Sequence, residues 1–307
     1  MKDVIIIAGP TAVGKTALSI NLAKKLNTEI ISADSMQIYS GMDIGTAKVS
    51  LEEMEGVKHH MIDILNPNEN FSVQQYQIEV LKIIEEIHKK GSIPIIVGGT
   101  GLYIDSLTHD FDFVNVKPNY ELREELESIY EKNPKELLDR VHKISNESYA
   151  HLSLKDKKKL IRAIEVYEDS GKIIDYSRSI KNTENNYHLF VLYDNRKKLY
   201  ERINERVDIM IADGLIDEVK AILKNTDEKA QSMKAIGYRE VIPYLKGETD
   251  LETMKSALKQ HSRNYAKRQL TWFRRNEYSQ WINIEGKTTE EIVEFIMNKV
   301  FNSFNNL

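Results

Sequence analysis

The sequence contains no cysteine, and this absence excludes several kinds of site. Disulfide bonds, thiolate metal sites and cysteine nucleophiles are all ruled out in a chain of 307 residues with no Cys. The lack of cysteine also fits a reducing compartment. We therefore expect a cytoplasmic protein without redox-active thiols.

Long hydrophobic runs and a strong net charge are missing too. No apolar stretch approaches the roughly 18 residues of a membrane-spanning helix, and the chain opens on a short strand-like run instead of a basic and then apolar leader. We expect neither a signal peptide nor contact with a membrane. The formal net charge is −4, so any binding of nucleic acid must come from local basic clusters.

The first hundred residues alternate strand and helix patterns. Short apolar runs at residues 3–8, 29–32 and 93–97 are separated by helical patterns at 15–25 and 72–90. Continuous apolar strands joined by helices are typical of a parallel sheet that is covered on both faces. The sequence therefore predicts an α/β fold.

The pattern changes after about residue 115, where strand signals almost disappear. The later segments read as a charged helical region (120–169), a polar linker (181–187), a strand (188–193), helices through residue 224, a long basic helix (251–275) and a late strand (280–284). We predict an α/β core made of residues 1–115 and 186–307, interrupted by a helical insertion domain at residues 116–185.

One segment after the first strand matches the phosphate-binding loop (P-loop) pattern G-x-x-x-x-G-K-[ST] at every fixed position. It comprises Gly9, Pro10, Thr11, Ala12, Val13, Gly14, Lys15 and Thr16. Backbone N–H groups and the start of the following helix would surround phosphate oxygens. Lys15 would add a positive charge, and the hydroxyl of Thr16 could bind Mg²⁺. We predict that this loop binds the phosphates of a substrate.

Asp34 follows the second predicted strand. Residues just past the carboxyl end of a parallel strand face the ligand crevice of such a sheet. Position alone leaves three roles open, because Asp34 could be a general base, a ligand of Mg²⁺ through water, or the N-cap of a helix.

Two further motifs have modest interpretations. The segment 98–103 is a second glycine-rich turn at the end of a strand, and a plain turn explains it. The pair His59-His60 with Asp63 could suggest a metal, but adjacent residues on a regular element point apart. A structural or substrate-contacting role is favoured for the two histidines.

Basic residues cluster in two places. The first cluster holds Lys155, Lys157, Lys158, Lys159 and Arg162, and the second holds Arg263, Lys267, Arg268, Arg274 and Arg275, with Tyr265, Trp272 and Phe273 between them. Such clusters can neutralise a nucleic-acid backbone while aromatic rings stack on unpaired bases. A solvated helix face is the alternative for each cluster taken alone.

Taken together, the motifs resemble the tRNA dimethylallyltransferases, also called tRNA isopentenyltransferases. The matching segments lie in the family's order at residues 9–16, 31–39, 41–48, 59–63, 98–103, 235–240 and 266–272. The stretch from Asp34 to Lys48 is the most specific of them. The family implies transfer of a dimethylallyl group from dimethylallyl diphosphate to N6 of the adenosine on the 3′ side of the tRNA anticodon.

The resemblance also implies roles for individual residues. Asp34 would be the general base, while Lys15, Arg206 and a Mg²⁺ ion held by Thr16 would stabilise the leaving diphosphate. Contacts with the tRNA anticodon stem-loop are implied for Asp34, Ser35, Met36, Gln37, Thr100, Arg123, Lys158, Lys159, Leu160, Ile161, Arg162, Arg263, Lys267 and Arg268. We expect a monomer that holds the tRNA between its core and its insertion domain.

One departure from the family lies in the insertion, where Asp156-Lys157-Lys158-Lys159 replaces the Pro and Gln that relatives often carry. This change keeps contact with phosphate plausible but puts base-specific contacts there in doubt. Two rival functions remain for the sequence alone. They are isopentenylation of free adenine nucleotides, which would need neither basic cluster, and a nucleotide-gated RNA-binding module that hydrolyses or senses ATP or GTP.

Overall fold

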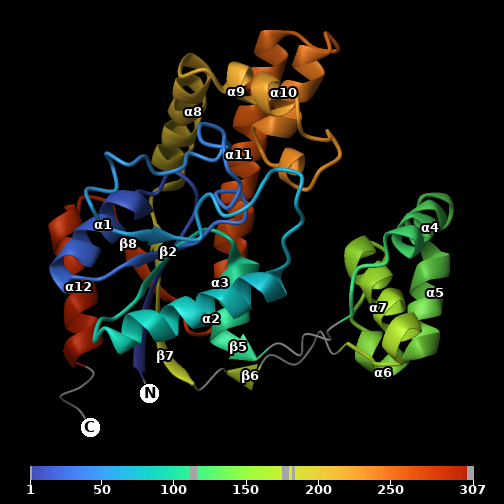
Figure 1. Cartoon of the computed structure of the whole chain (residues 1–307), viewed down its shortest axis with the longest axis horizontal. Coiled ribbons are helices and arrows are strands. Elements are labelled where there is room, and N and C mark those ends of the chain that lie inside the picture. Colours follow the sequence, from blue (N-terminus) through green and yellow to red (C-terminus); the bar gives the residue numbers. More distant parts are fainter. Residues whose placement is uncertain (1, 111–115, 175–179, 182–183, 303–307) are drawn as a thin grey trace. The chain divides into compact units, whose positions relative to one another are not determined.

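A computed structural model describes residues 2–110, 116–174, 180–181 and 184–302 (Figure 1). The chain divides into two units, which are described separately below. The larger unit comprises Met1–Thr108 and Thr183–Leu307, and the smaller comprises His109–Asn182. The smaller unit thus begins earlier than the predicted residue 116 and ends just before the predicted residue 185.

The larger unit is built on a parallel sheet of six strands in the order β3-β2-β4-β1-β7-β8. The strands are β1 (Lys2–Ala8), β2 (Ile30–Ala33), β3 (His59–His60), β4 (Ile95–Gly98), β7 (Asn185–Tyr193) and β8 (Gln280–Asn283). The central strand β1 pairs with β4 and β7, so the segments that follow these three strands meet at one edge of the sheet.

Apolar side chains of β1 alternate between two cores. Val4 and Ile6 point into one hydrophobic cluster, and Ile5 and Ile7 point into another on the opposite face. All four are fully buried. A strand that is covered on both faces needs no polar positions, which explains the continuous apolar runs of the sequence.

Helices cover both faces of this sheet (Figure 1). On one side α1 (Lys15–Leu26) packs against α12 (Thr289–Asn302), and on the other α2 (Val73–Lys89) packs against α3 (Gly101–Thr108). The remaining helices of this unit are α8 (Arg196–Ala212), α9 (Leu215–Ile222), the short 3₁₀ helix η1 (Ser232–Lys234), α10 (Tyr238–Leu245) and α11 (Leu251–Phe273). The predicted parallel α/β core with helices on both faces is confirmed.

One predicted boundary was wrong. Residues 185–187 were assigned to a polar linker, but they form the start of β7 and pair with Lys2–Val4 of β1. Their polar side chains hid the strand because this end of the sheet is only partly buried. Residues 182–183 of the predicted linker lie outside the described residues.

The described part of the smaller unit contains four helices with a core of their own. They are α4 (Tyr120–Lys132), α5 (Pro134–Ile144), α6 (Asn146–Tyr149) and α7 (Lys157–Ser170), and all four contribute to one hydrophobic cluster or its edge. The unit begins and ends on a short antiparallel pair, β5 (His109–Asp110) with β6 (Ile180–Lys181). The helical character predicted for residues 120–169 is confirmed.

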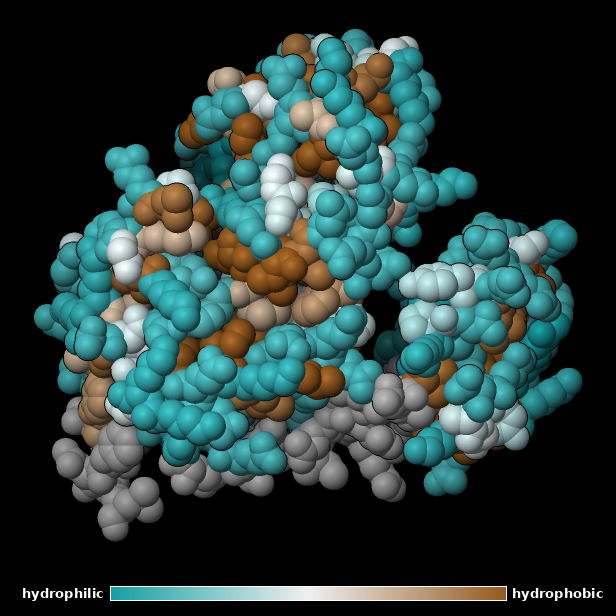
Figure 2. All heavy atoms as spheres, viewed as in Figure 1, coloured by the Kyte–Doolittle hydropathy of each residue, from teal (hydrophilic) through white to brown (hydrophobic). Residues whose placement is uncertain are grey.

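The surface in view is mainly hydrophilic on both units, with hydrophobic side chains gathered near the middle of the larger unit (Figure 2). Among the described residues, no helix combines the length and apolar character that crossing a membrane requires.

Glu29 ties together three segments at the start of β2. Its carboxylate bonds Nε2 of His60 in β3 at 2.6 Å and Nζ of Lys90 after α2, and Nζ of Lys58 lies 3.4 Å away. Partial burial acts to raise the pKa of Glu29, but the hydrogen bonds with Lys90 and His60 outweigh it and bring the pKa to about 2. The ionised carboxylate therefore stabilises the fold.

We expect Glu29→Gln to lower the free energy of unfolding by about 1 kcal/mol or less at pH 7, because solvent screens the partly exposed pair. Since the folded pKa lies below the usual 4.5, the contribution is complete above that pH and is lost as the pH falls toward 2. Urea denaturation of both proteins at pH 7, 4 and 2.5 measures this difference. Glu85→Gln, which breaks an exposed pair with Lys89, is the control; a difference for Glu29→Gln that stays constant with pH would contradict the assignment.

Candidate active site

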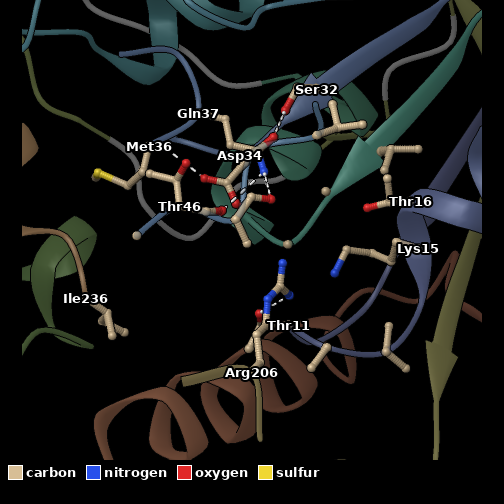
Figure 3. A pocket seen from close by; sticks show the side chains of 18 of the residues that line it. Thr11, Lys15, Thr16, Ser32, Asp34, Met36, Gln37, Thr46, Arg206 and Ile236 are labelled. Atoms are coloured by element: carbon tan, nitrogen blue, oxygen red, sulfur yellow. Dashed lines mark hydrogen bonds between the residues drawn. The ribbon is translucent and has the colours of Figure 1, made fainter. Parts of the chain in front are cut away.

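A cavity of about 720 Å³ lies at the edge of the sheet where the strands end (Figure 3). Every residue that lines it belongs to the larger unit. The phosphate-binding loop forms one wall, and the segments after β2 and β4 form another. Side chains from α8 and α11 complete it, including the aliphatic residues Ile203, Val207, Met210 and Leu258.

The loop at residues 9–16 joins β1 to α1, as the sequence pattern requires. Gly9 has φ 146°, and a Cβ added there would lie 2.7 Å from the carbonyl oxygen of Leu192 in β7. No side chain fits that space. Helix α1 starts after Gly14 with no acidic residue in its first turn and no side-chain cap. Its first N–H groups are therefore directed at any anion held by the loop.

Lys15 is folded back into this loop. Its Nζ donates to the carbonyl oxygens of Gly9 at 3.0 Å and Pro10 at 2.7 Å. Burial lowers the pKa of Lys15 to about 7, the nearby Arg206 lowers it as well, and Asp34 acts in the opposite direction. An anion bound in the loop would favour the charged form of Lys15 further.

Arg206 supplies a second, partly buried cation from α8. Its Nη1 donates to Oγ1 of Thr11 at 3.3 Å. Burial lowers the pKa of Arg206, while the negative charge of Asp34 raises it. Figure 3 shows the ends of Lys15 and Arg206 pointing toward the same space, with Asp34 on its far side.

Asp34 sits in a turn after β2. Its Oδ1 accepts a hydrogen bond from the backbone N–H of Met36 at 2.9 Å, and residues 35–38 form bends and turns. The helix N-cap alternative is therefore wrong. The carboxylate lines the cavity and influences the pKa of both Lys15 and Arg206, a position from which it can accept a proton.

The second glycine-rich turn is more than a plain turn. Thr100 accepts a hydrogen bond from the N–H of Ser35 at 3.1 Å through its Oγ1, and its own N–H donates to Ala33 at the end of β2. A Cβ on Gly99 would lie 2.0 Å from Nε2 of Gln269. Gly99 thus leaves room for the side chain of Gln269 from α11, which a Cβ there would displace.

Gln269 is a site residue that the sequence interpretation missed. Its buried side chain accepts from the N–H of Thr11 at 3.0 Å and donates to the carbonyl of Gly99 at 3.0 Å. It therefore bridges the phosphate-binding loop and the turn after β4. Because Gln269 takes the N–H of Thr11, that amide is not among those directed at phosphate. A polar residue on the buried side of a basic helix was the only signal.

Residues 35–37 play different parts. Met36 lines the cavity. The side chain of Gln37 accepts from Ser32 at 3.1 Å and donates to the carbonyls of Thr46 and Ala47 at 3.4 and 3.3 Å. Gln37 thus joins β2 to the segment 43–47, and this internal role competes with its predicted contact with tRNA.

The basic cluster on α11 is divided between two faces. Lys267 and Arg268 are exposed, and the Arg268 guanidinium lies 5.6 Å from the centre of the Tyr265 ring. Arg263 instead donates to Oδ1 of Asn204 in α8 at 2.6 Å, so it supports the helix packing. Arg274 and Arg275 are exposed as well.

Of the three aromatic residues in this cluster, one is not available for stacking on a base. Phe273 is fully buried, so stacking on a base is excluded for it. Trp272 donates through Nε1 to Oδ2 of Asp105 at 2.6 Å. Tyr265 lines the cavity, and burial raises its pKa well above the usual value.

In the smaller unit, the buried carboxylate of Glu165 organises two arginines. It accepts from Arg123 through both oxygens at 2.8 Å each and from Arg162 at 2.6 Å. Burial acts to raise the pKa of Glu165, but the hydrogen bonds with these arginines outweigh it and lower the pKa. Both arginines keep about a third of their side chains exposed.

The remaining residues predicted in the insertion differ in exposure. Lys158 and Lys159 are exposed, while Leu160 and Ile161 lie in the core of the unit. Contact of tRNA with the Leu160 and Ile161 side chains is therefore ruled out. The two residues belong to the apolar stripe of α7, which alternates with the basic positions.

The two histidines of the pair differ in position, because His59 lines the cavity and His60 supports the sheet edge. His59 and His60 form β3, and His60 bonds Glu29. Among the residues that the structure describes, no three His, Asp or Glu side chains gather in a way that could hold a metal ion. Thr16 and Asp34 both line the cavity, and such oxygen ligands, together with those of a bound diphosphate, suit Mg²⁺.

Comparisons with known proteins find related chains over nearly the whole length of this one. The family model described as IPP transferase matches residues 37–276. A tRNA dimethylallyltransferase of Oceanobacillus iheyensis is 45% identical over 97% of this chain and 96% of its own. A structure of tRNA isopentenylpyrophosphate transferase from Bacillus halodurans is 40% identical with a TM-score of 0.76, covering 100% of this chain and 98% of the other.

A more distant structure has the same architecture. It is a eukaryotic dimethylallyltransferase acting on tRNA, 27% identical with a TM-score of 0.82, and the match covers 98% of this chain and 80% of that one. The phosphate-binding loop and Asp34 precede the segment matched by the family model but fall within these nearly full-length matches. On the family match and the curated relative together, this chain belongs to the IPP transferase family.

Proposed function

We propose that this protein transfers the dimethylallyl group of dimethylallyl diphosphate to N6 of the adenosine on the 3′ side of the anticodon in tRNA. The observation that carries the proposal is the cavity in which the phosphate-binding loop, with Lys15 and Arg206, faces the carboxylate of Asp34. The cavity offers groups for both parts of the reaction, which are departure of the diphosphate and attack of the amine. A leaving diphosphate needs cations and N–H donors, and an attacking amine needs a base.

The proposed step breaks one bond and forms another at the same carbon. N6 of adenosine attacks C1 of the allyl group, the C1–O bond breaks, and the electron pair leaves with the diphosphate. Asp34 accepts the proton of N6. Lys15, Arg206 and the N–H groups at the start of α1 hold the negative charge that develops on the diphosphate. Ile203, Val207 and Met210 offer an apolar wall for the hydrocarbon part.

We propose Mg²⁺ as the accompanying ion. Thr16 would bind it together with the diphosphate oxygens, and the ion would neutralise part of the phosphate charge. We propose that the protein acts as a monomer.

Recognition of tRNA is assigned to the exposed cations. Lys267 and Arg268 on α11 would contact the phosphate backbone, and Lys158, Lys159, Arg123 and Arg162 of the smaller unit would do so as well. The target base must leave the anticodon-loop stack to reach Asp34, which costs a few kcal/mol. The backbone contacts would offset this cost.

The rival functions fit these residues less well. Modification of free adenine nucleotides leaves the exposed cations of α11 and α7 without a purpose. A nucleotide-sensing RNA-binding module would not need a carboxylate opposite the phosphate-binding loop.

Asp34→Asn tests the base. Asparagine keeps an oxygen for the N–H of Met36 but cannot accept the proton of N6. We expect the single-turnover rate of prenyl transfer to fall by about 100-fold or more, with tRNA affinity nearly unchanged. Radiolabelled dimethylallyl diphosphate and unmodified tRNA provide the assay, and a rate close to that of the wild type would refute the role of Asp34.

Lys15→Met tests the loop. Methionine fills a similar volume and removes the charge that would face the diphosphate. We expect KM for dimethylallyl diphosphate to rise, or kcat to fall, by about 100-fold, since a buried charge-assisted contact is lost. The affinity for tRNA alone serves as the control. Unchanged kinetics would mean that the diphosphate binds elsewhere.

Lys267→Gln tests the basic face of α11. Each contact with a phosphate contributes about 0.7 to 0.9 to the slope of log affinity against log salt, so we expect this variant to lower the slope by about that amount. Lys259→Gln on the same helix is the matched control, because Lys259 already pairs with Asp208 at 2.7 Å. Equal slopes for Lys267→Gln and the wild type would remove this residue from the tRNA contact.

A further inference from the structure

The proposed function does not explain the segment 43–48, although it belongs to the most specific stretch of the sequence. Gly45, Thr46 and Ala47 line the cavity on the side of Asp34. The segment has no regular secondary structure. It must therefore be held in place by contacts with other parts of the chain.

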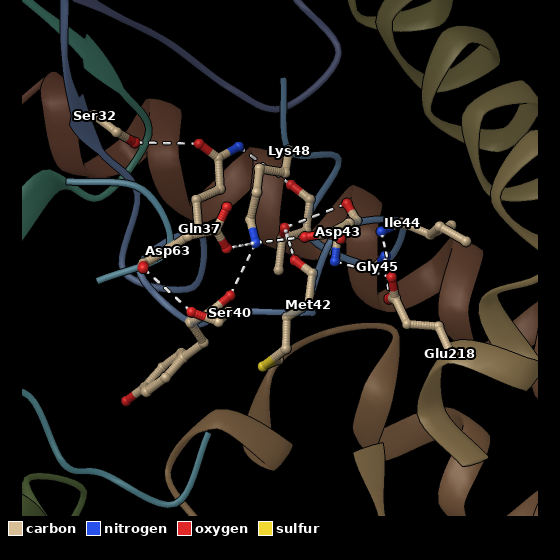
Figure 4. A network of polar contacts seen from close by, with 12 residues as sticks. Ser32, Gln37, Ser40, Met42, Asp43, Ile44, Gly45, Lys48, Asp63 and Glu218 are labelled. Carbon is tan, nitrogen blue, oxygen red and sulfur yellow. Dashed lines mark hydrogen bonds and ion pairs between the residues drawn. The ribbon is translucent and has the colours of Figure 1, made fainter. Parts of the chain in front are cut away.

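Glu218 of α9 provides the strongest of these contacts (Figure 4). Its Oε2 accepts from the N–H groups of Asp43 at 2.9 Å and Ile44 at 2.7 Å, and its Oε1 accepts from the N–H of Gly45 at 3.0 Å. Three successive amides thus converge on one carboxylate, as they would on a bound anion.

Tyr238 stabilises the carboxylate of Glu218 through a further hydrogen bond. Its hydroxyl donates to Oε1 of Glu218 at 2.5 Å, and its ring is fully buried. Burial raises the pKa of Tyr238 far above its usual value, and the bond to Glu218 adds to this effect. The hydroxyl therefore stays protonated and can only support the carboxylate as a donor.

A second clamp closes the other end of the segment. Nζ of Lys48, whose side chain is only 5% exposed, donates to the carbonyl of Tyr39 at 2.9 Å and to the carboxylates of Asp43 and Asp63 at 2.6 and 2.5 Å. Between the two clamps, the carbonyls of Thr46 and Ala47 accept from Gln37. The segment is therefore fixed at both ends, and its middle is bonded to Gln37.

Gln37 connects the segment to Asp34. Its Oε1 accepts from Ser32 in β2, and its backbone directly follows the turn of residues 34–36, which the bond from Met36 to Asp34 closes. Hydrogen bonds joined by short stretches of backbone therefore lead from Glu218 through the segment 43–47 and Gln37 to the turn that carries the proposed base.

We propose that Glu218 is a positioning residue for the transfer reaction, which fixes the segment 43–47 and, through Gln37, the orientation of Asp34. This inference rests on the proposed function. The hydrogen bonds of Glu218 described above go to residues 43–45 and Tyr238. None of them goes to the phosphate-binding loop. Its effect must therefore appear in the chemical step and not in the binding of the diphosphate.

Glu218→Gln is the central variant. In glutamine an NH₂ group replaces one carboxylate oxygen. This group is a donor, and it would face N–H or O–H groups that are donors themselves, so their hydrogen bonds are lost. We expect the single-turnover rate of prenyl transfer, with enzyme in excess, to fall about tenfold, while KM for dimethylallyl diphosphate is retained. A single-turnover rate constant does not depend on the fraction of folded enzyme, so a loss of stability alone would not change it.

Three further variants complete the design. Asp217→Asn removes the same charge from the adjacent, exposed position of α9 and is expected to react like the wild type. Tyr238→Phe removes one of the four bonds to Glu218 and should slow the step by about threefold or less. Gln37→Leu breaks the link to the turn, and combined with Glu218→Gln it should be no slower than the slower single variant, because both act in one series.

The outcomes separate the possible failures. A wild-type rate in Glu218→Gln, or effects of Gln37→Leu and Glu218→Gln that multiply, would overturn the positioning role. If Glu218→Gln does not fold, as judged by circular dichroism, Tyr238→Phe combined with Gln37→Leu provides the same coupling test. Absence of prenylated tRNA with the wild-type protein would instead refute the proposed function.

Discussion

The burial of positive charge beside one cavity wall is the constraint on which the rest of the site depends. Lys15 and Arg206 both lose solvation there, and their pKa values fall as a result. Asp34 is the negative group that acts on both. The cavity therefore combines a wall that carries two cationic groups with a carboxylate opposite, and the edge of the sheet holds the loop of Lys15 apart from Asp34.

The sheet achieves this separation through close contacts between backbones. Strand β7 leaves no room for a side chain on Gly9, and α11 leaves none on Gly99. Gln269 uses both ends of its amide between these two turns. The phosphate-binding loop is thus fixed by a helix from the far end of the sequence, and the same helix carries exposed cations on its outer face.

Much of this architecture was accessible from the sequence, because apolar periodicity and the phosphate-loop pattern are local signals. The strands β1, β2, β4 and β8 and the helix α11 were predicted close to their observed bounds. What the sequence could not indicate were pairings between distant positions. Gln269 with Thr11, Glu218 with residues 43–45, and Glu165 with Arg123 each depend on tertiary contacts. For the same reason, Leu160, Ile161 and Phe273 were placed at a surface although they belong to cores.

The short pairing of β5 with β6 has a consequence for the evolution of the fold. It brings together the points at which the chain enters and leaves the smaller unit. The smaller unit is therefore an insertion whose two ends lie next to each other. Such an insertion can become longer or shorter, or change its sequence, with little entropic cost to the rest of the chain. The smaller unit also has its own hydrophobic core, so mutations there need not disturb the sheet. The fold therefore allows the sequence of the smaller unit to diversify independently of the cavity in the larger unit.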